Sequence, residues 1–583
     1  MNRIKSVIAT GVLCLGLLVT SVGSACTNFL FTKGATADGS TMITYAADSH
    51  TLYGELYYRK AADYPAGTMF MLVEWDTGKP LFKIPQVAHT YSVVGNMNEC
   101  QLAIGETTYG GREECWNKPV KGIDYGSLIY VTLQRAKNAR EAIKVMAELC
   151  DTYGYCSEGE SFSICDPNEV WVMDLIGKGV GEYDTVKGKP VLKKAYKGFK
   201  EGAVWVARRI PDGYVCGHAN QARITTFPQE VKGSWKAISS KNMSHIFDPE
   251  VECVYSHDVV AFARMKGWYD GKDADFSFAD TYAPLTFSGV RACDARVYAM
   301  FRRVNKSMEQ YEDYAMGWNN DNRMPLWIKP DHKLSLQEVM DLMRDHYEGT
   351  RMDMTQDVGA GPFACPYRWR PMGFSIDGKN YIHERATSTQ QTGFSFVAQC
   401  RSWLPNKVGG IIWFGVDDTY STVYCPMYCG ITEIPECFRE GNGDMLTYSP
   451  TSAFWLFNRV TNFVYSRYKD MIVDLQKVQR ELETSFINQV AVNDQSVKNL
   501  TDPALTDKLN SFSNGRANQM MNRWNQLDQY LLVKYIDGNV KKEENGKFKR
   551  SEYNMAVPPS QPQYPESFYR AIVKDHGDII IEK

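Results

Sequence analysis

The chain has 583 residues and a formal net charge of −3; 44% of the residues are hydrophobic and 23% are charged. This composition is typical of a folded globular protein, and the length exceeds the usual size of a single domain. The near-neutral charge gives no reason to expect a nucleic acid or an acidic membrane surface as a partner.

The first 25 residues have the pattern of a secretory signal peptide. Arg3 and Lys5 supply positive charge, residues 7–22 are mostly apolar, and the small residues 23–25 (GSA) precede the expected cleavage point. After this segment, no apolar run is long enough to span a bilayer. We therefore expect an exported protein, periplasmic or secreted, with no membrane contact unless it is lipidated.

Cleavage after Ala25 would leave Cys26 with both a thiol and a free α-amine. The two groups titrate near about pH 8.5 and about pH 8, so the amine can serve as the base that activates the thiol. Two alternatives stay open from the local sequence. In the first alternative, Cys26 is a lipid-anchored residue, although Gly23 stands where lipoprotein signals usually have a branched apolar residue. In the second, cleavage falls elsewhere and Cys26 is an ordinary strand cysteine.

The fifteen cysteines, of which Cys14 leaves with the signal, are too few for a fold held together by disulfides in a chain of this length. Cys425 and Cys429 are spaced for a local disulfide or a partial metal site, but no histidine lies nearby at a zinc-like spacing. We predict no metal and no cofactor.

Apolar and turn patterns predict mixed α and β structure in the first half of the chain. Residues 26–32 and 41–46 read as two strands, with Asp38-Gly39 as a turn signal in their connection. Residues 124–152 have a helical apolar stripe. Residues 169–174, 203–207 and 214–216 read as further strands.

The second half changes from strands to helices. Ser335 and Glu338 form a capping-box pattern that predicts a helix start, with apolar residues continuing to Tyr347 and a stop at Gly349. Residues 392–416 read as central strands. Residues 452–490 and 504–536 are largely helical, and the Lys/Glu-rich and then Pro-rich tail from residue 540 is expected to be peripheral.

Several separated segments, in the same order, resemble a known family. They are CTNFLFTKGATADGSTMITYAADSH from Cys26, Asn98-Glu99 with residues 102–106 (LAIGE), 154–161 (GYCSEGES), 218–221 (HANQ), 345–349 (DHYEG) and 388–391 (STQQ). The chain resembles the secreted dipeptidases among the N-terminal-nucleophile hydrolases, which are related to choloylglycine hydrolase and penicillin acylase. The resemblance runs from Cys26 to about Asp418.

This resemblance implies an α+β fold, a four-layer αββα sandwich with a helical C-terminal addition. The expected organisation is a signal peptide over 1–25, a catalytic domain over 26–449, a helical region packed on it over 450–540, and a tail over 541–583. The implied function is an exported cysteine dipeptidase that takes small peptides as substrates. The alternatives are an acylase acting on N-acyl amino acids or bile-salt-like amides, and a lipid-anchored binding protein without catalysis.

The resemblance also implies roles for individual residues. Cys26 would be the nucleophile and its α-amine the base; Asp48 would hold that amine, Asn220 and Asn98 would stabilise the oxyanion, and Arg296 would order the site. Tyr45 departs from the related acylases, which usually have an arginine there, so either another arginine substitutes for it or the charge balance differs.

Other polar residues have both a functional and a structural interpretation. His218 is interpreted as structural, because a histidine base is redundant beside the α-amine. Acidic positions that are candidates for receiving a substrate amine are Glu158, Glu160 and Asp417-Asp418, although such acids are more often solvated. Arg370 and Arg385 are candidates for binding a substrate carboxylate, although ordinary ion pairing is commoner.

Overall fold

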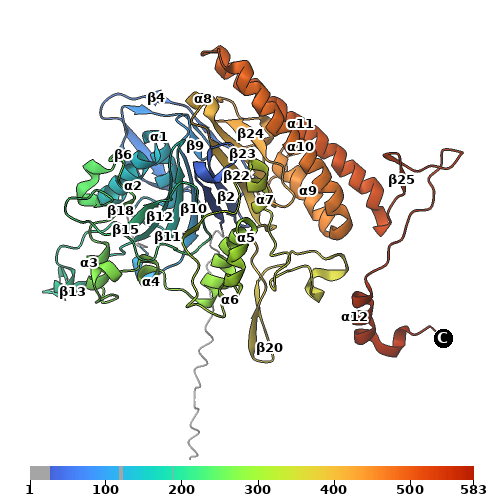
Figure 1. The fold of residues 1–583 in the computed structure, drawn as a ribbon, viewed down its shortest axis with the longest axis horizontal. Helices are drawn as coiled ribbons and strands as arrows, with labels where there is room; N and C mark the ends of the chain where they lie inside the picture. Colours follow the sequence, from blue (N-terminus) through green and yellow to red (C-terminus); the bar gives the residue numbers. More distant parts are fainter. Residues whose placement is uncertain (1–25, 117–121, 188, 583) are drawn as a thin grey trace, which may run out of the picture.

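The computed structural model describes residues 26–116, 122–187 and 189–582 and shows a mixed α+β fold with two large β-sheets. Figure 1 shows the sheets at the centre, with helices α1 and α2 on one side and the long C-terminal helices on the other. The predicted signal peptide lies outside the described residues.

The first sheet has seven strands, and every neighbouring pair is antiparallel. Its central strands are buried along their whole length, which explains their continuous apolar sequences. The predicted strands at 26–32, 41–46 and 392–416 are confirmed. In spatial order the strands are β19 (Trp327–Ile328), β16 (Val215–His218), β1 (Asn28–Phe31), β2 (Thr41–Asp48), β22 (Thr392–Cys400), β23 (Gly410–Val416) and β24 (Cys425–Tyr428).

The second sheet has nine strands, antiparallel except for the edge pair β17–β18. In spatial order they are β17 (Ala237–Ser239), β18 (Cys253–Tyr255), β15 (Ala203–Arg209), β12 (Val170–Gly177), β11 (Gly159–Cys165), β10 (Ala103–Tyr109), β9 (Met97–Asn98), β8 (Val93–Val94) and β3 (Tyr58–Arg59). Strands β1 and β2 of the first sheet pack against β10 and β11 of the second.

Alternation along β12 shows how the second sheet divides two cores. Val170, Val172 and Ile176 belong to the core shared with the first sheet. Trp171 and Met173 belong to a separate core beneath α1 (Tyr125–Arg135) and α2 (Ala139–Tyr153). Successive side chains of a strand point to opposite faces, so one strand serves both cores.

The C-terminal helices α9 (Ala453–Tyr465), α10 (Tyr468–Val497) and α11 (Ala504–Tyr535) pack against β23 and β24, as Figure 1 shows. The predicted helical character of 452–490 and 504–536 is confirmed, and the apolar face of α10 is buried, with Leu475 and Phe486 fully inaccessible. Two buried ion pairs also join α10 to the rest of the molecule, Arg344–Glu483 and Arg401–Asp494, both 2.5 Å.

Shorter elements surround this frame. Two-stranded ribbons pair β4 (Ala62–Asp63) with β7 (His89–Thr90), β5 (Met69–Val73) with β6 (Pro80–Pro85), β13 (Tyr183–Val186) with β14 (Lys189–Leu192), β20 (Gly373–Ile376) with β21 (Lys379–Ile382), and β25 (Glu543–Glu544) with β26 (Lys547–Phe548). The remaining α-helices are α3 (Val259–Met265), α4 (Phe278–Tyr282), α5 (Ala295–Val304), α6 (Glu312–Ala315), α7 (Leu336–Leu342), α8 (Asn406–Gly409) and α12 (Glu566–His576).

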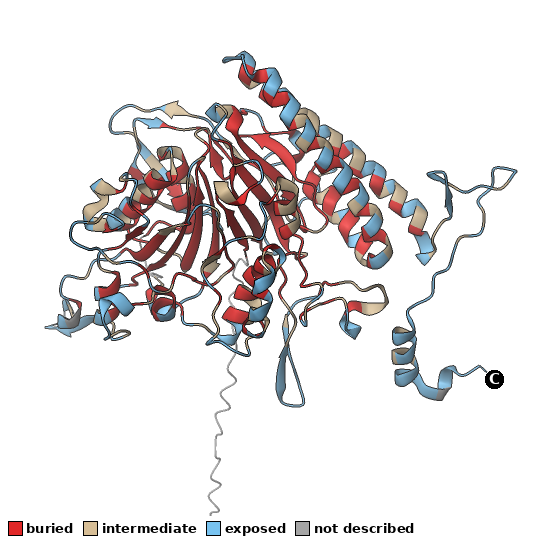
Figure 2. Cartoon of the chain, viewed as in Figure 1, coloured by how far each residue is buried: buried red, intermediate tan, exposed pale blue. Residues whose placement is uncertain are grey.

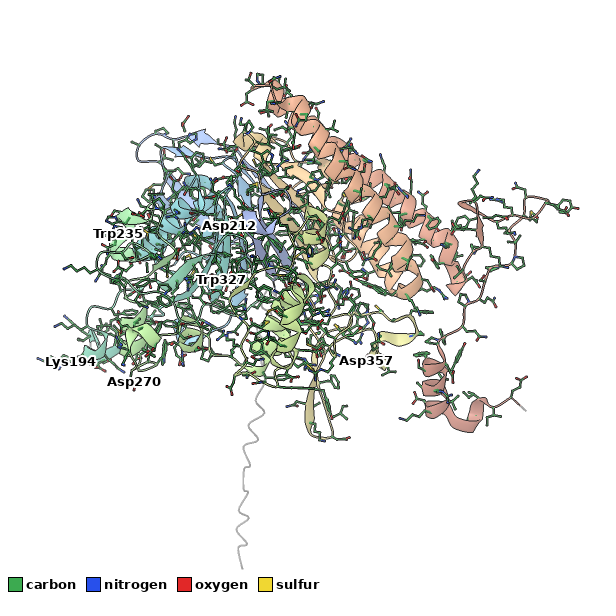
Figure 3. The ribbon with its side chains drawn as sticks, in the orientation of Figure 1. Lys194, Asp212, Trp235, Asp270, Trp327 and Asp357 are labelled. Carbon is green, nitrogen blue, oxygen red and sulfur yellow. The ribbon has the colours of Figure 1, made fainter. Side chains whose placement is uncertain are left out.

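Polar and charged side chains gather at the periphery. Side chains labelled in Figure 3, such as Asp212 and Asp357, are exposed, whereas the sheets in Figure 2 are buried almost throughout. The tail from residue 541 is mostly exposed and extends away from the body, in agreement with its predicted peripheral position. Within the described residues, no helix is both long and apolar enough to cross a membrane.

Two local predictions need correction. The capping box at Ser335 and Glu338 is present, but α7 ends at Leu342 and not near Gly349, and the chain could not have stayed helical through Tyr347, whose backbone is left-handed with φ 64°. Cys425 and Cys429 are both buried free thiols and form no local disulfide.

Candidate active site

Cys26 lies at the start of β1, where the two sheets face each other. The next residue, Thr27, bridges to Ala46 through hydrogen bonds of 3.2 and 3.0 Å, so Cys26 is held beside β2. Its side chain is fully buried. The Sγ atom lies 3.6 Å from Tyr45 Oη and 3.7 Å from Glu106 Oε1. The thiol therefore faces polar groups from both sheets.

Tyr45 and Glu106 form a hydrogen-bonded pair against the thiol. Tyr45 Oη donates to Glu106 Oε1 at 2.5 Å, and the Tyr45 ring is held edge-on by Phe394 and Phe396. Burial raises the pKa of Tyr45 well above its ordinary value, so the phenol stays protonated as the donor. Asn28, with its amide oriented to satisfy both groups, bonds the backbone N and O of Glu106 at 3.0 Å each.

Arg296 joins two other predicted site residues, Cys26 and Asn220. Its Nη1 donates to Cys26 O at 2.6 Å and to Thr27 Oγ1 at 2.8 Å, while Nη2 donates to Asn220 Oδ1 at 2.7 Å. Asn220 Nδ2 in turn donates to Thr108 O at 2.5 Å. Arg296 begins α5 directly after the π-helix η6 (Gly289–Asp294), an irregularity that often marks functional sites.

Asp48 lies at a bulge at the end of β2 and is fully buried. It accepts hydrogen bonds from Arg385 Nη2 at 2.5 Å and from Thr392 Oγ1 at 2.6 Å. Burial raises its pKa, while the positive charge of Arg385 opposes that rise. Arg385 is thus ion-paired within the protein, and the structure gives it a different task from the predicted capture of a substrate carboxylate.

Asn98 occupies a different position from the other predicted residues. Its Nδ2 donates to Leu133 O and Ala136 O, both at 2.7 Å, and its Oδ1 accepts from the backbone N of Cys100 and Leu102. All the hydrogen-bonding capacity of this amide is used to tie the β9–β10 turn to the end of α1. The geometry therefore does not favour Asn98 as an oxyanion donor.

His218 links the sheets as a neutral side chain. Its Nδ1 lies 2.7 Å from Thr107 Oγ1 on β10, and its Nε2 lies 2.7 Å from Ser163 Oγ on β11. Burial lowers its pKa to about 3, and the charge of Arg223 adds to this effect. A fully buried imidazole with both nitrogens occupied agrees with the structural interpretation of His218.

A cavity of about 410 Å³ is lined by Tyr45 and Glu106, the two residues that contact the thiol, while Cys26 itself is not among its lining residues. Glu160 on β11 also lines it, because Thr108 pairs with Glu160 in the β10–β11 register and Thr108 shares a face with Glu106. Glu160 accepts from Thr108 Oγ1 at 2.8 Å. Burial raises the pKa of both glutamates, and for Glu160 the charge of Glu106 raises it further.

Comparison with known proteins identifies the family. The family model for peptidase family C69 matches residues 25–481. The chain belongs to peptidase family C69. A probable dipeptidase of Latilactobacillus sakei is 21% identical over 88% of this chain and 95% of its own length. Probable dipeptidase B of Streptococcus pyogenes serotype M1 is 20% identical over 91% and 97%, and a probable dipeptidase of Salmonella dublin is 21% identical over 72% and 84%.

The C69 match begins one residue before Cys26 and continues into α10, so it includes the whole of the site described above. Among the other candidates from the sequence, Asp418 accepts from Ser388 and Tyr367, and neither Asp417 nor Asp418 lines the cavity. No group of three or more His, Cys, Asp and Glu side chains suited to a metal is found in the part of the chain that the structure describes.

Sequence reasoning missed the role of Glu106 in this C69 site. The residue was visible only as part of the 102–106 segment, on a strand far from Cys26 in sequence. Its contact with the thiol depends on how the two sheets stack, and no local pattern encodes that. The one available signal was a glutamate in a strand with no other charged residue, which is unusual for a buried position.

Proposed function

We propose that this chain is an exported dipeptidase that uses Cys26 as its nucleophile. The observation that carries the proposal is the buried Cys26 thiol, which lies within 3.7 Å of two residues lining the cavity and is held by Arg296 through its own carbonyl. The relatives named as probable dipeptidases support the same activity. Contact between the two sheets, with helices on their outer sides, supports the four-layer αββα arrangement.

In the proposed reaction, Cys26 Sγ attacks the scissile carbonyl carbon while the Cys26 α-amine takes the thiol proton. The amine then delivers that proton to the leaving nitrogen, which departs as the free amine of the second residue. The remaining thioester is hydrolysed by water, whose proton returns through the same amine. Release of the first residue's carboxylate restores the thiol.

Supporting roles follow from the contacts around Cys26. Arg296 fixes the Cys26 backbone and the orientation of the Asn220 amide, so we assign Asn220 to the oxyanion. Removal of one such donor typically costs about 3 kcal/mol of transition-state stabilisation. Asp48, held by Arg385 and Thr392, is assigned to the α-amine.

We assign the substrate carboxylate to Arg370, because this exposed side chain lies near Arg385 and Arg296. Desolvation of the guanidinium, together with these two positive charges, lowers the pKa of Arg370 to about 10, which still leaves it charged at neutral pH. Arg370 Nη2 donates to Gln391 Oε1, and among the described residues it has no ion-pair partner. The site thus has a cationic side and an acidic side, as expected for a zwitterionic dipeptide.

The proposal is tested by replacing Cys26 and by weighing the mature chain. We expect Cys26→Ala to lower the activity on Ala-Ala by at least about a thousandfold and to leave the circular dichroism spectrum unchanged. Mass spectrometry of the mature protein should give an N-terminus at Cys26 with an unmodified amine. Full activity in Cys26→Ala would refute the nucleophile, and a diacylglyceryl mass on Cys26 would favour the lipid-anchored alternative. Faster hydrolysis of acyl conjugates than of dipeptides would favour the acylase.

A further inference from the structure

The cavity beside Cys26 has a strongly acidic lining. Five of its lining residues are carboxylates, and none of the described lining residues is Lys or Arg. Glu74, Asp76 and Glu158 are exposed or partly exposed, whereas Glu106 and Glu160 are fully buried at the end nearest the thiol. The buried carboxylates, Glu106 and Glu160, are therefore the ones whose charge water screens least.

The two buried glutamates hydrogen-bond to each other, and beyond this contact each has one oxygen without a partner. Glu106 Oε2 and Glu160 Oε2 are inaccessible and accept no hydrogen bond from a described donor. Burying a carboxylate without a compensating partner is costly, so buried carboxylates in proteins are normally paired or protonated. A proton shared between the two carboxyl groups meets this requirement in the empty site, and a bound cation would meet it better.

The distance from the thiol indicates which cation fits. At attack, Sγ is about 3–3.5 Å from the scissile carbon. The α-nitrogen of the same residue is only about 2.5 Å from that carbon, since one tetrahedral carbon separates them. Glu106 Oε1 is 3.7 Å from Sγ. A carboxylate at this distance is within hydrogen-bonding reach of an α-ammonium, whereas a lysine ammonium lies four carbons further out.

We infer that Glu106 and Glu160 together bind the α-ammonium group of the residue whose carbonyl Cys26 attacks. This inference deepens the proposed function and rests on it. The site then requires a free N-terminus on its substrate, which restricts it to the first peptide bond of a peptide. An N-acylated amino acid offers no cation to the two glutamates and leaves them with only the proton that they share.

The inference is tested by binding, so that it does not depend on turnover. The ligands are Ala-Ala and propionyl-Ala, which differ by the ammonium group alone, and the protein is the mature Cys26→Ala chain studied by calorimetry at pH 7. We expect Ala-Ala to bind at least about 30-fold more tightly than propionyl-Ala. A difference of this size is typical when a buried charge is deprived of its partner. In Glu160→Gln and in Glu106→Gln, this preference should fall to about threefold or less.

The matched control is Glu74→Gln, which removes a carboxylate from the partly exposed lining of the same cavity. Its preference for Ala-Ala should stay within about threefold of the parent value, because exposed charges contribute little. Equal affinity of the parent chain for the two ligands would overturn the inference, and this comparison requires no glutamate variant to fold. An unchanged preference in both buried-glutamate variants would overturn it as well. Neither result would touch the role of Cys26, which is decided by hydrolysis.

Discussion

At the residue scale, Arg296 is the side chain that holds the parts of the site together. It is fully buried, and one guanidinium contacts the Cys26 carbonyl, the Thr27 hydroxyl and the Asn220 amide oxygen. Its Nε also donates to Ala292 O at 2.9 Å, which fixes the side chain to its own helix. A planar fork with several donors can serve these partners simultaneously, and a single ammonium cannot.

We therefore predict that Arg296→Lys lowers kcat/KM on Ala-Ala by roughly 10- to 100-fold, because the nucleophile and the oxyanion donor lose their common support. The free energy of unfolding should fall by about 1–3 kcal/mol, since buried acceptors lose their donors. Steady-state kinetics and denaturant unfolding measure the two effects. Arg302→Lys on the same helix is the control. Activity within twofold of the parent enzyme in Arg296→Lys would remove the positioning role.

Single residues were predictable from sequence where a local pattern carries the signal. Cys26 follows a leader-like segment, and this alone is enough to suggest an N-terminal nucleophile. Asn98 had a matching segment as well, yet its amide is occupied by the backbone of α1 and the β9–β10 turn. A motif gives the residue type, whereas hydrogen-bond partners from distant segments decide what the side chain does.

At the element scale, the two sheets are joined by a buried polar contact from β16. His218 reaches Thr107 on β10 and Ser163 on β11, so one imidazole links the first sheet to two strands of the second. Its pKa is lowered to about 3 by burial, against about 6.5 in an unfolded chain. Between these two pH values, His218 therefore binds a proton in the unfolded state but not in the folded state.

The stability contribution of neutral His218 is complete above about pH 6.5 and is lost as the pH falls toward about 3. At pH 5 the loss amounts to about 2 kcal/mol. We predict that the difference in unfolding free energy between the parent chain and His218→Gln shrinks by about this amount between pH 7.5 and pH 5. His576→Gln, in exposed α12, should show no such change. A pH-independent difference for His218→Gln would mean that the histidine takes up its proton as readily in the folded state as in the unfolded state.

Strands and helices were predicted well where apolar periodicity decides them. The strands predicted at 26–32, 41–46, 169–174, 203–207, 214–216 and 392–416 are present, and the 124–152 stripe is divided into α1 and α2 where Asn138 caps the second helix. Pairing was harder to predict. β10 and β11 are neighbours in the sheet but are separated in sequence by both helices, so the register that places Glu160 beside Glu106 has no local signal.

At the scale of the whole molecule, the C-terminal helices are part of one packed body. Trp524 of α11 is fully buried and stacks on Phe457 of α9 with ring centres 4.4 Å apart. The buried Arg344 and Arg401 have their carboxylate partners on α10. The family match ends at residue 481, before both of these partners, Glu483 and Asp494.

We predict that a chain ending at 540 folds with an unfolding free energy within about 1 kcal/mol of the full chain, because the tail is mostly exposed. A chain ending at 481 should fail to fold, since the buried Arg401 loses its carboxylate partner at a cost of about 3–5 kcal/mol, Arg344 keeps only Asp341 of its two partners, and the face beneath α11 is uncovered. Circular dichroism and thermal unfolding of the two chains provide the measurement. Cooperative unfolding of the 481 chain would show that α11 and the end of α10 are dispensable.

The place of β1 has a practical consequence for handling the enzyme. This strand lies inside its sheet, between β16 and β2, and the residue before it is enclosed at the meeting point of the two sheets. The opposite terminus stands clear of the body in Figure 1. In the proposed mechanism, a purification handle fused directly ahead of Cys26 would cap the α-amine that serves as the base, so a preparation made that way would be inactive, whereas the same handle after residue 583 would leave that amine free.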